Sequence, residues 1–390
     1  MRGAMAILLP LLLPLRLGAS PGGTFLAPSN QTSQLYVGCS RTTIAHHLHV
    51  RLPDFVVIGV QKGGTTSVIQ DLNAAQPQVA CMAWGELHFF DRNEFSNISI
   101  TAHDVEAYAQ RLSSKTRCQQ STVALAEKTP AYYYSPHAPL RLCEALGSPR
   151  LVIFLRDPTS RAYSSFYEGG DVTHLGRNAN GFHRLVEIEV AIIRGCPDSA
   201  QPSGDPAIDH ERSAHFRECC SALVGSSFGQ GSWLGCSCDL SDFHCSIYGD
   251  KRAAQVRMGL YIWHLRRIYR YHRASNVLLV RAEDFFVHGA DTLKEMLAWA
   301  TPNRANTIYH VQIPTEHAGS KTTLHEHMLP VTERLLREFY APFNADLEEL
   351  VGRKMHWPVP PPAPPPAPPP PVPPATPPLA PLPPVPKGHS

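Results

Sequence analysis

The chain has 390 residues with a formal net charge of +2, and 43% of them are hydrophobic against 17% charged. This composition excludes a wholly disordered chain, and the balanced charge excludes a general nucleic-acid binder, so any anion site must be local. Nineteen of the 37 prolines lie in residues 358–390, which therefore cannot belong to a packed domain. The remainder is long enough for one large domain or two small ones.

The first twenty residues have the layout of a secretory signal peptide. A basic residue, Arg2, precedes an apolar run over residues 4–15, and small residues follow at 18–20. Because the run is shorter than the ~20 residues of a membrane-spanning helix, a retained signal-anchor is the weaker alternative. Residues 21–50 are polar and weakly patterned, and we expect a stem there. We expect contact with a membrane only through the N-terminal anchor, if it is retained.

Continuous apolar runs, typical of strands buried on both faces, lie at Phe55–Val60, Arg150–Leu155 and Asn276–Val280, with a weaker one at Val123–Ala126. Helical patterns lie between and after them, at Thr65–Ala75, Gln255–Tyr271 and Asp291–Ala300. Strands that alternate with helices predict an α/β fold with a central parallel sheet and flanking helices.

Ten cysteines suit an oxidising compartment, and six of them lie between Cys196 and Cys245. They fall in residues 170–251, which interrupt the alternation of strands and helices. We expect a cysteine-rich insertion braced by disulfides whose connectivity the sequence leaves open. The alternative is a zinc site formed by Cys236, Cys238, His244 and Cys245. Its C-x-C spacing differs from the usual zinc knuckle, so we expect no metal.

The tail over residues 358–390 is proline with alanine and valine spacers, which predicts extended polyproline II structure. A spacer, a ligand of proline-reading modules and a glycosylated stalk remain open as its role.

The first apolar run leads into a glycine-rich turn and then a helix that begins with hydroxyl residues. The predicted anion cradle comprises Lys62, Gly63, Gly64, Thr65, Thr66 and Ser67. Glycines allow close approach of the backbone to an anion, and a helix N-terminus offers free N–H groups. A capped glycine turn without a ligand is the competing interpretation. In a nucleotide triphosphatase loop a lysine follows the last glycine, but here Thr65 occupies that position.

Five ordered segments resemble sulfotransferases that use 3′-phosphoadenosine 5′-phosphosulfate (PAPS), in particular the heparan-sulfate and chondroitin-type Golgi enzymes. They are FVVIGVQKGGTTS (55–67), WGELHFFDR (84–92), EKTPAY (127–132), LVIFLRDPTSRAYSSFY (151–167) and REFYAPFNADLEELVGRKMHW (337–357). The resemblance implies a sulfotransferase domain over residues 51–357, with the insertion at 170–251 outside the match. It also implies a P-loop-like phosphosulfate loop, PAPS as co-substrate and a carbohydrate acceptor, with a polysaccharide favoured.

The resemblance also implies catalytic roles. Glu86 corresponds to the general base for the acceptor hydroxyl, and Lys62 to the cation on the leaving phosphate. His88 and Asp91 would orient the base or the acceptor, and Lys128 would lie near the reacting groups. Without the resemblance, Glu86 could be a solvated loop charge, His88 a core histidine and Lys128 a partner of Glu127.

Arg156 and Ser164 correspond to the residues that hold the 3′-phosphate, and an ion pair of Arg156 with Asp157 is the alternative. A late basic loop of the family matches this chain weakly, with Lys321 as its candidate. Arg161 is expected to be structural. The arginines of the helix at 259–273 are expected either to touch an anionic glycan or to be solvated; they are Arg266, Arg270 and Arg273.

The sequence therefore predicts a PAPS-dependent carbohydrate O-sulfotransferase of the secretory pathway, most simply of the Golgi lumen, with secretion as the alternative. Its reaction would need no metal, because Lys62 and a helix N-terminus can neutralise the leaving phosphate. Two alternatives remain. One is a P-loop nucleotide kinase, and the other is a non-enzymatic secreted proline-rich protein of the matrix or glycan-binding type.

Overall fold

The computed structural model describes residues 30–39, 50–75, 80–91, 100–118, 124–147, 149–168, 175–196, 255–304, 313 and 326–359. Several predictions fall outside these ranges and stay predictions. They concern the signal peptide, most of the stem, the zinc alternative, Lys321 and the tail from residue 360.

The core of the described chain is a five-stranded parallel sheet in the order β2-β3-β1-β4-β5. The strands are β1 (Phe55–Gly59), β2 (Ala80–Met82), β3 (Ala124–Lys128), β4 (Arg150–Leu155) and β5 (Val277–Arg281). The α/β fold with a central parallel sheet is thus confirmed, and four strands lie where the apolar runs predict them. β2 was not predicted, because three residues carry too short a pattern.

The strand order creates a switch point beside β1. After β1 the chain forms β2 and β3 on one side, and then β4 and β5 on the other. Phe55 of β1 pairs with both Ala126 of β3 and Arg150 of β4, so β1 has hydrogen-bonded neighbours on both sides. Ligands of open α/β sheets bind outside the carboxyl ends of the strands at such a point. A ligand site is therefore expected at the loops that follow β1 and β4.

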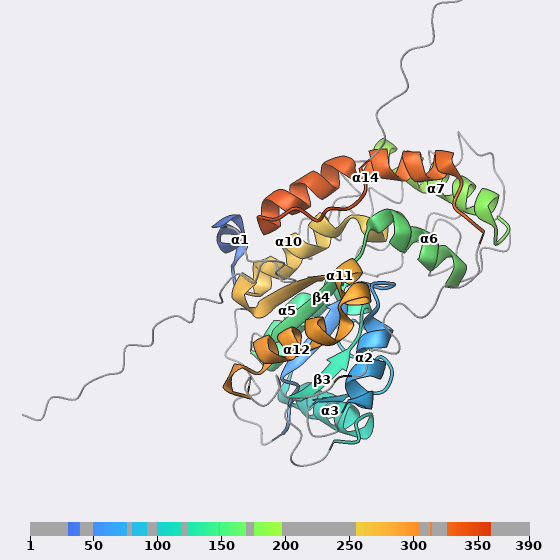
Figure 1. Ribbon diagram of the computed structural model, residues 1–390. Helices are drawn as coiled ribbons and strands as arrows, with labels where there is room; N and C mark the ends of the chain where they lie inside the picture. Colours follow the sequence, from blue (N-terminus) through green and yellow to red (C-terminus); the bar gives the residue numbers. More distant parts are fainter. Residues whose placement is uncertain are drawn as a thin grey trace, which may run out of the picture. The chain divides into compact units, whose positions relative to one another are not determined.

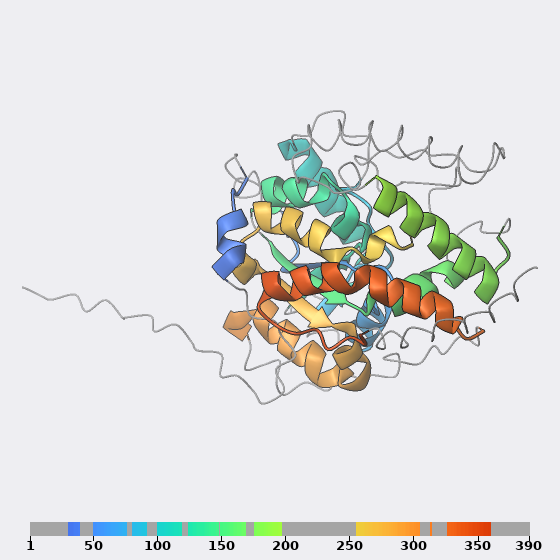
Figure 2. The ribbon, with the colours of Figure 1, turned by 90° about the horizontal axis from the view of Figure 1, so that it is seen from above.

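Helices cover both faces of the sheet. Those before residue 200 are α1 (Asn30–Leu35), α2 (Thr65–Ala74), α3 (Ala102–Ser114), α4 (Ala131–Tyr134), α5 (Ala138–Leu146), α6 (Pro158–Glu168) and α7 (Ala179–Gly195). The later ones are η2 (Arg257–Gly259), α10 (Tyr261–Tyr271), η3 (Ala274–Asn276), α11 (Ala282–Val287), α12 (Gly289–Ala300), η4 (Pro302–Arg304) and α14 (Pro330–Val351). The view from above in Figure 2 shows α12 and α10 on opposite sides of the strands.

The alternation of side chains along β1 builds two separate cores. Phe55 and Val57 face a cluster that includes Leu72 of α2 and Leu293 of α12. Val56 and its neighbours on the other face join a larger cluster with α3, α5, α6, α7, α10 and α14. Because both faces are buried, the strands are apolar throughout, as the continuous runs indicate.

Helix α7 lies inside the span expected to be an insertion, yet it packs into the larger core. Phe182 of α7 is fully buried, and its ring lies 5.2 Å from that of Phe166 on α6. The buried Glu189 of α7 accepts backbone hydrogen bonds from Gln255 and Val256, just ahead of η2. Residues 175–196 are therefore part of the same packed unit as the sheet, whereas residues 197–254 lie outside the described ranges.

Two disulfides brace the first half of the domain. Cys39 pairs with Cys143 of α5, and Cys81 of β2 pairs with Cys118 after α3. Cys196 is disulfide-bonded as well. Disulfides are thus confirmed, and none of the described cysteines is free.

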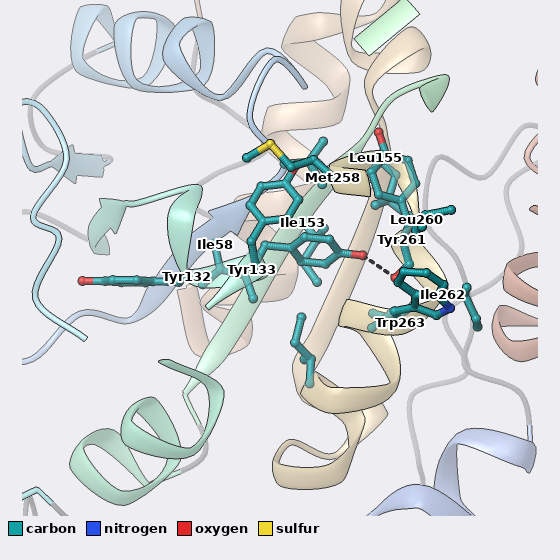
Figure 3. Packing of buried hydrophobic residues seen from close by; sticks show 14 of the residues in the cluster. Ile58, Tyr132, Tyr133, Ile153, Leu155, Met258, Leu260, Tyr261, Ile262 and Trp263 are labelled. Atoms are coloured by element: carbon teal, nitrogen blue, oxygen red, sulfur yellow. Dashed lines mark hydrogen bonds between the residues drawn. The ribbon is translucent and has the colours of Figure 1, made fainter. Parts of the chain in front are cut away.

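The chain turns back beneath α14 after that helix ends (Figure 1). Trp357 is 8% exposed, its ring centroid lies 5.9 Å from that of Tyr261, and its Nε1 donates to Glu283 Oε2 over 3.3 Å. Tyr261 in turn accepts a hydrogen bond on its carbonyl oxygen from the Tyr133 hydroxyl, 2.9 Å away (Figure 3). The packed domain therefore extends to residue 357, immediately before the proline-rich tail.

We expect Trp357→Ala to lower the free energy of unfolding by about 3–5 kcal/mol, because it removes a large buried aromatic side chain. Val359→Ala, at a residue that is 79% exposed, should change it by less than about 0.5 kcal/mol. Deletion of residues 360–390 should also leave it unchanged. Guanidinium denaturation of the three variants beside wild type tests the boundary. A loss on tail deletion comparable to that of Trp357→Ala would contradict it.

Candidate active site

The loop after β1 is shaped by two glycines. A Cβ on Gly63 would lie 2.5 Å from the carbonyl oxygen of Phe154, so no larger residue fits there without a shift of the backbone. Gly64 has φ +90°, and a Cβ there would lie 2.7 Å from the Phe286 ring. Both positions therefore need glycine, which keeps the loop close against β4.

Helix α2 begins directly at this loop. Its N-cap is Gly64, and no side chain caps the first N–H groups. Of the three predicted hydroxyl residues, Thr65 is buried, Ser67 is half-buried and Thr66 is exposed. A helix start without a side-chain cap leaves backbone donors for an anion.

Lys62 and Arg156 meet at the switch point. Arg156 directly follows β4, and its Nη1 donates to the carbonyl oxygen of Lys62 over 3.1 Å. Lys62 has φ +70°, an uncommon backbone conformation for a residue with a side chain, and its Nζ forms an ion pair with Glu168 at the end of α6. The structure thus places the Arg156 guanidinium against the Lys62 backbone, while the Lys62 ammonium group pairs with Glu168.

Arg156 is held from several sides. Its guanidinium lies 5.6 Å from the centroid of the Phe286 ring, and its carbonyl oxygen accepts a hydrogen bond from the Tyr261 hydroxyl over 2.8 Å. Burial lowers the pKa of Arg156, which still leaves it charged at neutral pH. Ser164, predicted beside it, lies half-buried on α6.

Asp157 does not form the ion pair with Arg156 that the sequence left open as an alternative. Its carboxylate accepts hydrogen bonds from the backbone N–H groups of Thr159 and Ser160, and thereby caps the start of α6. It also lies 3.7 Å from Nη1 of Arg337 on α14. Arg161 is fully buried and donates to the carbonyl oxygen of Gln255, so it has the structural role expected of it.

The second group of predicted residues forms a continuous chain of ion pairs. Lys128 Nζ lies 2.7 Å from Glu86 Oε1, and His88 Nε2 lies 3.0 Å from Glu86 Oε2. On its other side, His88 Nδ1 lies 2.7 Å from Asp91 Oδ2. Lys128 is therefore a partner of Glu86, which resolves the alternative in which it pairs with Glu127.

The contacts along this chain shift two pKa values. The hydrogen bond to Asp91, together with that to Glu86, raises the pKa of His88 to about 9 against the opposing effect of burial. Burial raises the pKa of Glu86, but its hydrogen bonds to His88 and Lys128 outweigh burial, so the pKa lies below the ordinary value. At neutral pH Glu86 is thus a carboxylate and His88 an imidazolium.

A support beneath residues 86–91 was not anticipated. The Thr129 hydroxyl accepts the backbone N–H of Leu87 over 3.0 Å, and the Tyr132 hydroxyl accepts that of Phe89 over 3.0 Å. Arg141 adds a bond from Nη1 to the carbonyl oxygen of Phe90 over 2.9 Å. In the sequence, Thr129 and Tyr132 were noted only as members of the EKTPAY segment (127–132). Their role was missed because a sequence pattern does not reveal which backbone groups a hydroxyl will contact.

Trp84 was also missed as a surface feature. Its side chain is 52% exposed although it lies two residues before Glu86. Its backbone N–H donates to the carbonyl oxygen of Lys115 over 2.8 Å, beside the Cys81–Cys118 bridge. Lys115 and Arg117 are both exposed. The exposed Trp84 ring thus lies next to the Glu86 segment, and its backbone contact with Lys115 brings a basic stretch of the chain to the same place.

The Lys62–Arg156 group and the Glu86–Asp91 group lie at one edge of the sheet, because each follows the carboxyl end of a parallel strand.

The other expected features of the site are less specific. Arg266 and Arg273, on and just after α10, are exposed, and the Arg273 guanidinium lies 5.1 Å from the Tyr36 ring. Within the described ranges there is no helix long and apolar enough to cross a bilayer. The same ranges contain no cluster of three His, Cys, Asp or Glu residues suited to a metal ion.

The chain is similar in sequence to known sulfotransferases. Residues 52–300 match the family model described as "Sulfotransferase domain". Heparan sulfate glucosamine 3-O-sulfotransferase 5 of Mus musculus is 24% identical over 335 residues, which cover 80% of this chain and 76% of that protein. The membrane-associated sulfotransferase kil1 of Dictyostelium discoideum is 30% identical over 150 residues, or 37% of this chain and 30% of that protein. A solved sulfotransferase from Alicyclobacillus acidocaldarius aligns over 78% of this chain and 98% of its own, with a TM-score of 0.46 and 19% identity.

We expect the pKa of His88 to be about 9 when measured by NMR, with the His88→Gln variant used to assign its signal. Asp91→Asn should move it toward 6.5, because the hydrogen bond to Asp91 is the largest cause of the shift. Asp346→Asn, an exposed substitution on α14, should leave it unchanged.

The same shift predicts a pH dependence of stability. The folded-state pKa lies above the unfolded value, so the stabilisation from His88 is complete below about pH 6.5 and is lost as the pH rises through about 9. The difference in unfolding midpoint between wild type and His88→Gln should shrink over that window. A constant difference from pH 6 to 10 would contradict the ion-paired chain.

Proposed function

The chain belongs to the sulfotransferase family, and we propose that it transfers the sulfuryl group of PAPS to a hydroxyl of a carbohydrate. The observation that carries the proposal is the position of the two predicted groups at one edge of the sheet. Lys62 and Arg156, the proposed anion site, lie at the switch point, and Glu86, with its cationic neighbours, follows β2. A single edge thus offers cations for a phosphorylated donor and a carboxylate for an acceptor hydroxyl.

The proposed donor site divides the charges of PAPS between two cations. Arg156 binds the 3′-phosphate, with help from Ser164, because a guanidinium can form two parallel bonds to a phosphate. Lys62, the glycine loop and the uncapped start of α2 bind the 5′-phosphosulfate. Glu168, the partner of Lys62, competes with the donor for this ammonium group.

The proposed reaction is a direct transfer. The acceptor oxygen forms a bond to sulfur, the bond between sulfur and the 5′-phosphate oxygen breaks, and the hydroxyl proton passes to Glu86. The products are a sulfate ester and 3′-phosphoadenosine 5′-phosphate. Lys62 stabilises the negative charge that develops on the leaving phosphate. His88 and Lys128 keep Glu86 ionised and fix its two oxygens, so that it can accept the proton.

The acceptor side is consistent with an anionic glycan. The exposed Trp84 ring offers an apolar face for a sugar ring, and the exposed Lys115 and Arg117 offer positive charge. Several relatives are named as heparan sulfate glucosamine 3-O-sulfotransferases, so a glycosaminoglycan of the heparan sulfate type is the first acceptor to test. The signal-like leader and the disulfides support a site of action in the secretory pathway, with the Golgi lumen as the simplest location.

The proposal is tested by incubating the full chain with radiolabelled PAPS and a panel of desulfated glycosaminoglycans and neutral glycans. We expect label in at least one carbohydrate. Stabilisation of the fold by ATP but not by PAPS, with no labelled carbohydrate, would contradict the proposal.

Glu86→Gln should lower kcat by about 10²–10⁴-fold, because the amide cannot accept the proton of the acceptor hydroxyl. The Kd for PAPS should stay nearly the same, since Glu86 does not hold the nucleotide. Glu106→Gln, which removes an exposed charge on α3, is the matched control and should keep full activity. Turnover and PAPS binding are measured for both variants. If Glu86→Gln keeps more than about a tenth of wild-type kcat, the base is another residue and His88 becomes the first candidate.

Arg156→Ala should weaken binding of PAPS by about 1.5–3 kcal/mol, the range for hydrogen bonds to a charged group. Binding of an analogue that lacks the 3′-phosphate should hardly change. Isothermal titration with both nucleotides measures the difference, and Arg266→Ala, at an exposed position on α10, is the control. Equal losses for the two nucleotides would show that Arg156 acts on the loop through the Lys62 carbonyl oxygen and not on the 3′-phosphate.

A further inference from the structure

A buried carboxylate lies beneath the segment that carries Glu86. Glu127, near the end of β3, is 0% exposed. Its Oε1 accepts a hydrogen bond from the Tyr108 hydroxyl of α3 over 2.8 Å, and its Oε2 accepts one from the Thr129 hydroxyl over 2.9 Å. The Tyr132 hydroxyl of α4 is also near enough to lower the pKa of Glu127 as a hydrogen-bond donor. Three neutral hydroxyls, and no cation among these partners, thus satisfy the carboxylate.

Two of these hydroxyls connect Glu127 to the backbone on either side of His88. Thr129 accepts the N–H of Leu87, and Tyr132 accepts the N–H of Phe89. His88 itself has φ +47°, a conformation that is unfavourable for a residue with a side chain. The segment therefore needs support at this position, and the two hydroxyls provide it on both sides.

The direction of the hydrogen bonds depends on the charge of Glu127. An ionised carboxylate only accepts, so the Thr129 and Tyr132 hydroxyls point their hydrogens toward it and keep lone pairs for the backbone N–H groups. A protonated carboxyl donates to one of these oxygens and competes with the backbone for it. Charge on Glu127 thus holds both hydroxyls in the accepting orientation.

We propose that Glu127 is a positioning residue, which holds the Glu86–His88 segment in its reactive geometry through the hydroxyls of Thr129 and Tyr132. This inference rests on the proposed function for its effect on turnover. Glu127 is fully buried, so it acts through Thr129 and Tyr132 and does not itself contact the acceptor.

The proposal gives the activity a pH dependence near neutrality. Burial raises the pKa of Glu127 to about 7 against its hydrogen bonds from Tyr108, Thr129 and Tyr132, and the charge of Asp91 adds to the increase. Burial raises the pKa values of Tyr108 and Tyr132 well above the ordinary range, so neither titrates in this window. The pKa of Glu86 lies below its ordinary value, so the base does not titrate between pH 8 and 6. Burial raises the pKa of Glu189 to about 7 as well, so only the comparison with Glu127→Gln assigns the loss of activity to Glu127.

The test uses paired variants of the full chain. Glu127→Gln mimics the protonated form, and Tyr132→Phe removes one connecting hydroxyl. Tyr133→Phe is the matched control, because Tyr133 is an equally buried neighbour whose hydroxyl points away from this segment to the carbonyl oxygen of Tyr261 (Figure 3). Thr129→Val and its conservative partner Thr129→Ser test the other connection and remain informative if Glu127→Gln does not fold.

At pH 8 we expect kcat to fall about 10- to 100-fold in Glu127→Gln, Tyr132→Phe and Thr129→Val, the loss typical of small misplacement of reacting groups. The KM for PAPS should not change, and Thr129→Ser and Tyr133→Phe should stay within about threefold of wild type. The ratio of wild-type to Glu127→Gln kcat should shrink as the pH falls through about 7. Titration of the nucleotide affects both proteins alike, so this ratio isolates Glu127.

A second readout needs neither donor nor acceptor. Hydrogen exchange of the peptide over residues 84–91 should be faster in Glu127→Gln and Tyr132→Phe than in wild type, and unchanged in Tyr133→Phe. Wild-type kcat, pH profile and exchange in both Glu127→Gln and Tyr132→Phe would overturn the inference. If wild type sulfates no carbohydrate but exchange responds as expected, the proposed function fails while the positioning role of Glu127 stands.

Stability separates positioning from unfolding. The folded pKa of Glu127 lies above the unfolded value of 4.5, so its contribution to stability is present below that pH and lost as the pH rises through about 7. Glu127→Gln should therefore unfold no earlier than wild type at pH 8, where its kcat is reduced. A variant that is both less active and much less stable at pH 8 would indicate a merely structural carboxylate.

Discussion

A parallel sheet that is buried on both faces has no place for chemistry along its strands. The residues of β1 are buried throughout, and helices cover the sheet on each side. Polar groups can accumulate only where the strands end, and in a parallel sheet all carboxyl ends meet at the same edge. This constraint explains why residues from four separate stretches of sequence come together in one region. It also explains why Lys62 and Arg156 lie in the loops after β1 and β4, whereas the middle of each of these two strands contains no charged residue.

The carboxylates of this domain differ mainly in what surrounds them. Glu86 faces an ammonium and an imidazolium group, which favour its charged form. Glu127 and Glu189 accept their hydrogen bonds from neutral groups, and burial raises the pKa of each to about 7, although the charge of Arg161 lowers that of Glu189. Neutral hydrogen bonds offset part of the cost of burying a charge, but they do not cancel it as a cation would. One residue type is therefore paired with cations at the surface of the candidate site, and with hydroxyls or backbone amides in the interior.

Much of the fold was predictable, because long apolar runs and regular alternation dominate the sequence around β1, β4 and β5. The glycine loop and Arg156 were also predictable as a pair, since each follows a strand that the pattern locates. β2 was not predicted because three residues are too few to show the hydrophobic pattern of a strand. The support from Thr129 and Tyr132 escaped for a different reason. A hydroxyl can bond to almost any backbone group, so only the tertiary structure determines which amides it holds. Cysteine pairing was undetermined for the same reason, because spacing in sequence does not fix distance in space.

The two described disulfides are nested: the Cys81–Cys118 loop lies entirely inside the loop closed by Cys39 and Cys143, which are 104 residues apart. A chain that is synthesised and oxidised from its amino terminus exposes Cys39 and Cys81 first, and pairing them in order of appearance would give a non-native bridge. The native arrangement requires Cys39 to wait until α5 has emerged, or requires a bridge formed earlier to be exchanged. Biosynthesis of this domain therefore needs either late oxidation of Cys39 or thiol–disulfide exchange, and a host that oxidises Cys39 early without exchanging disulfides would accumulate misbridged chains.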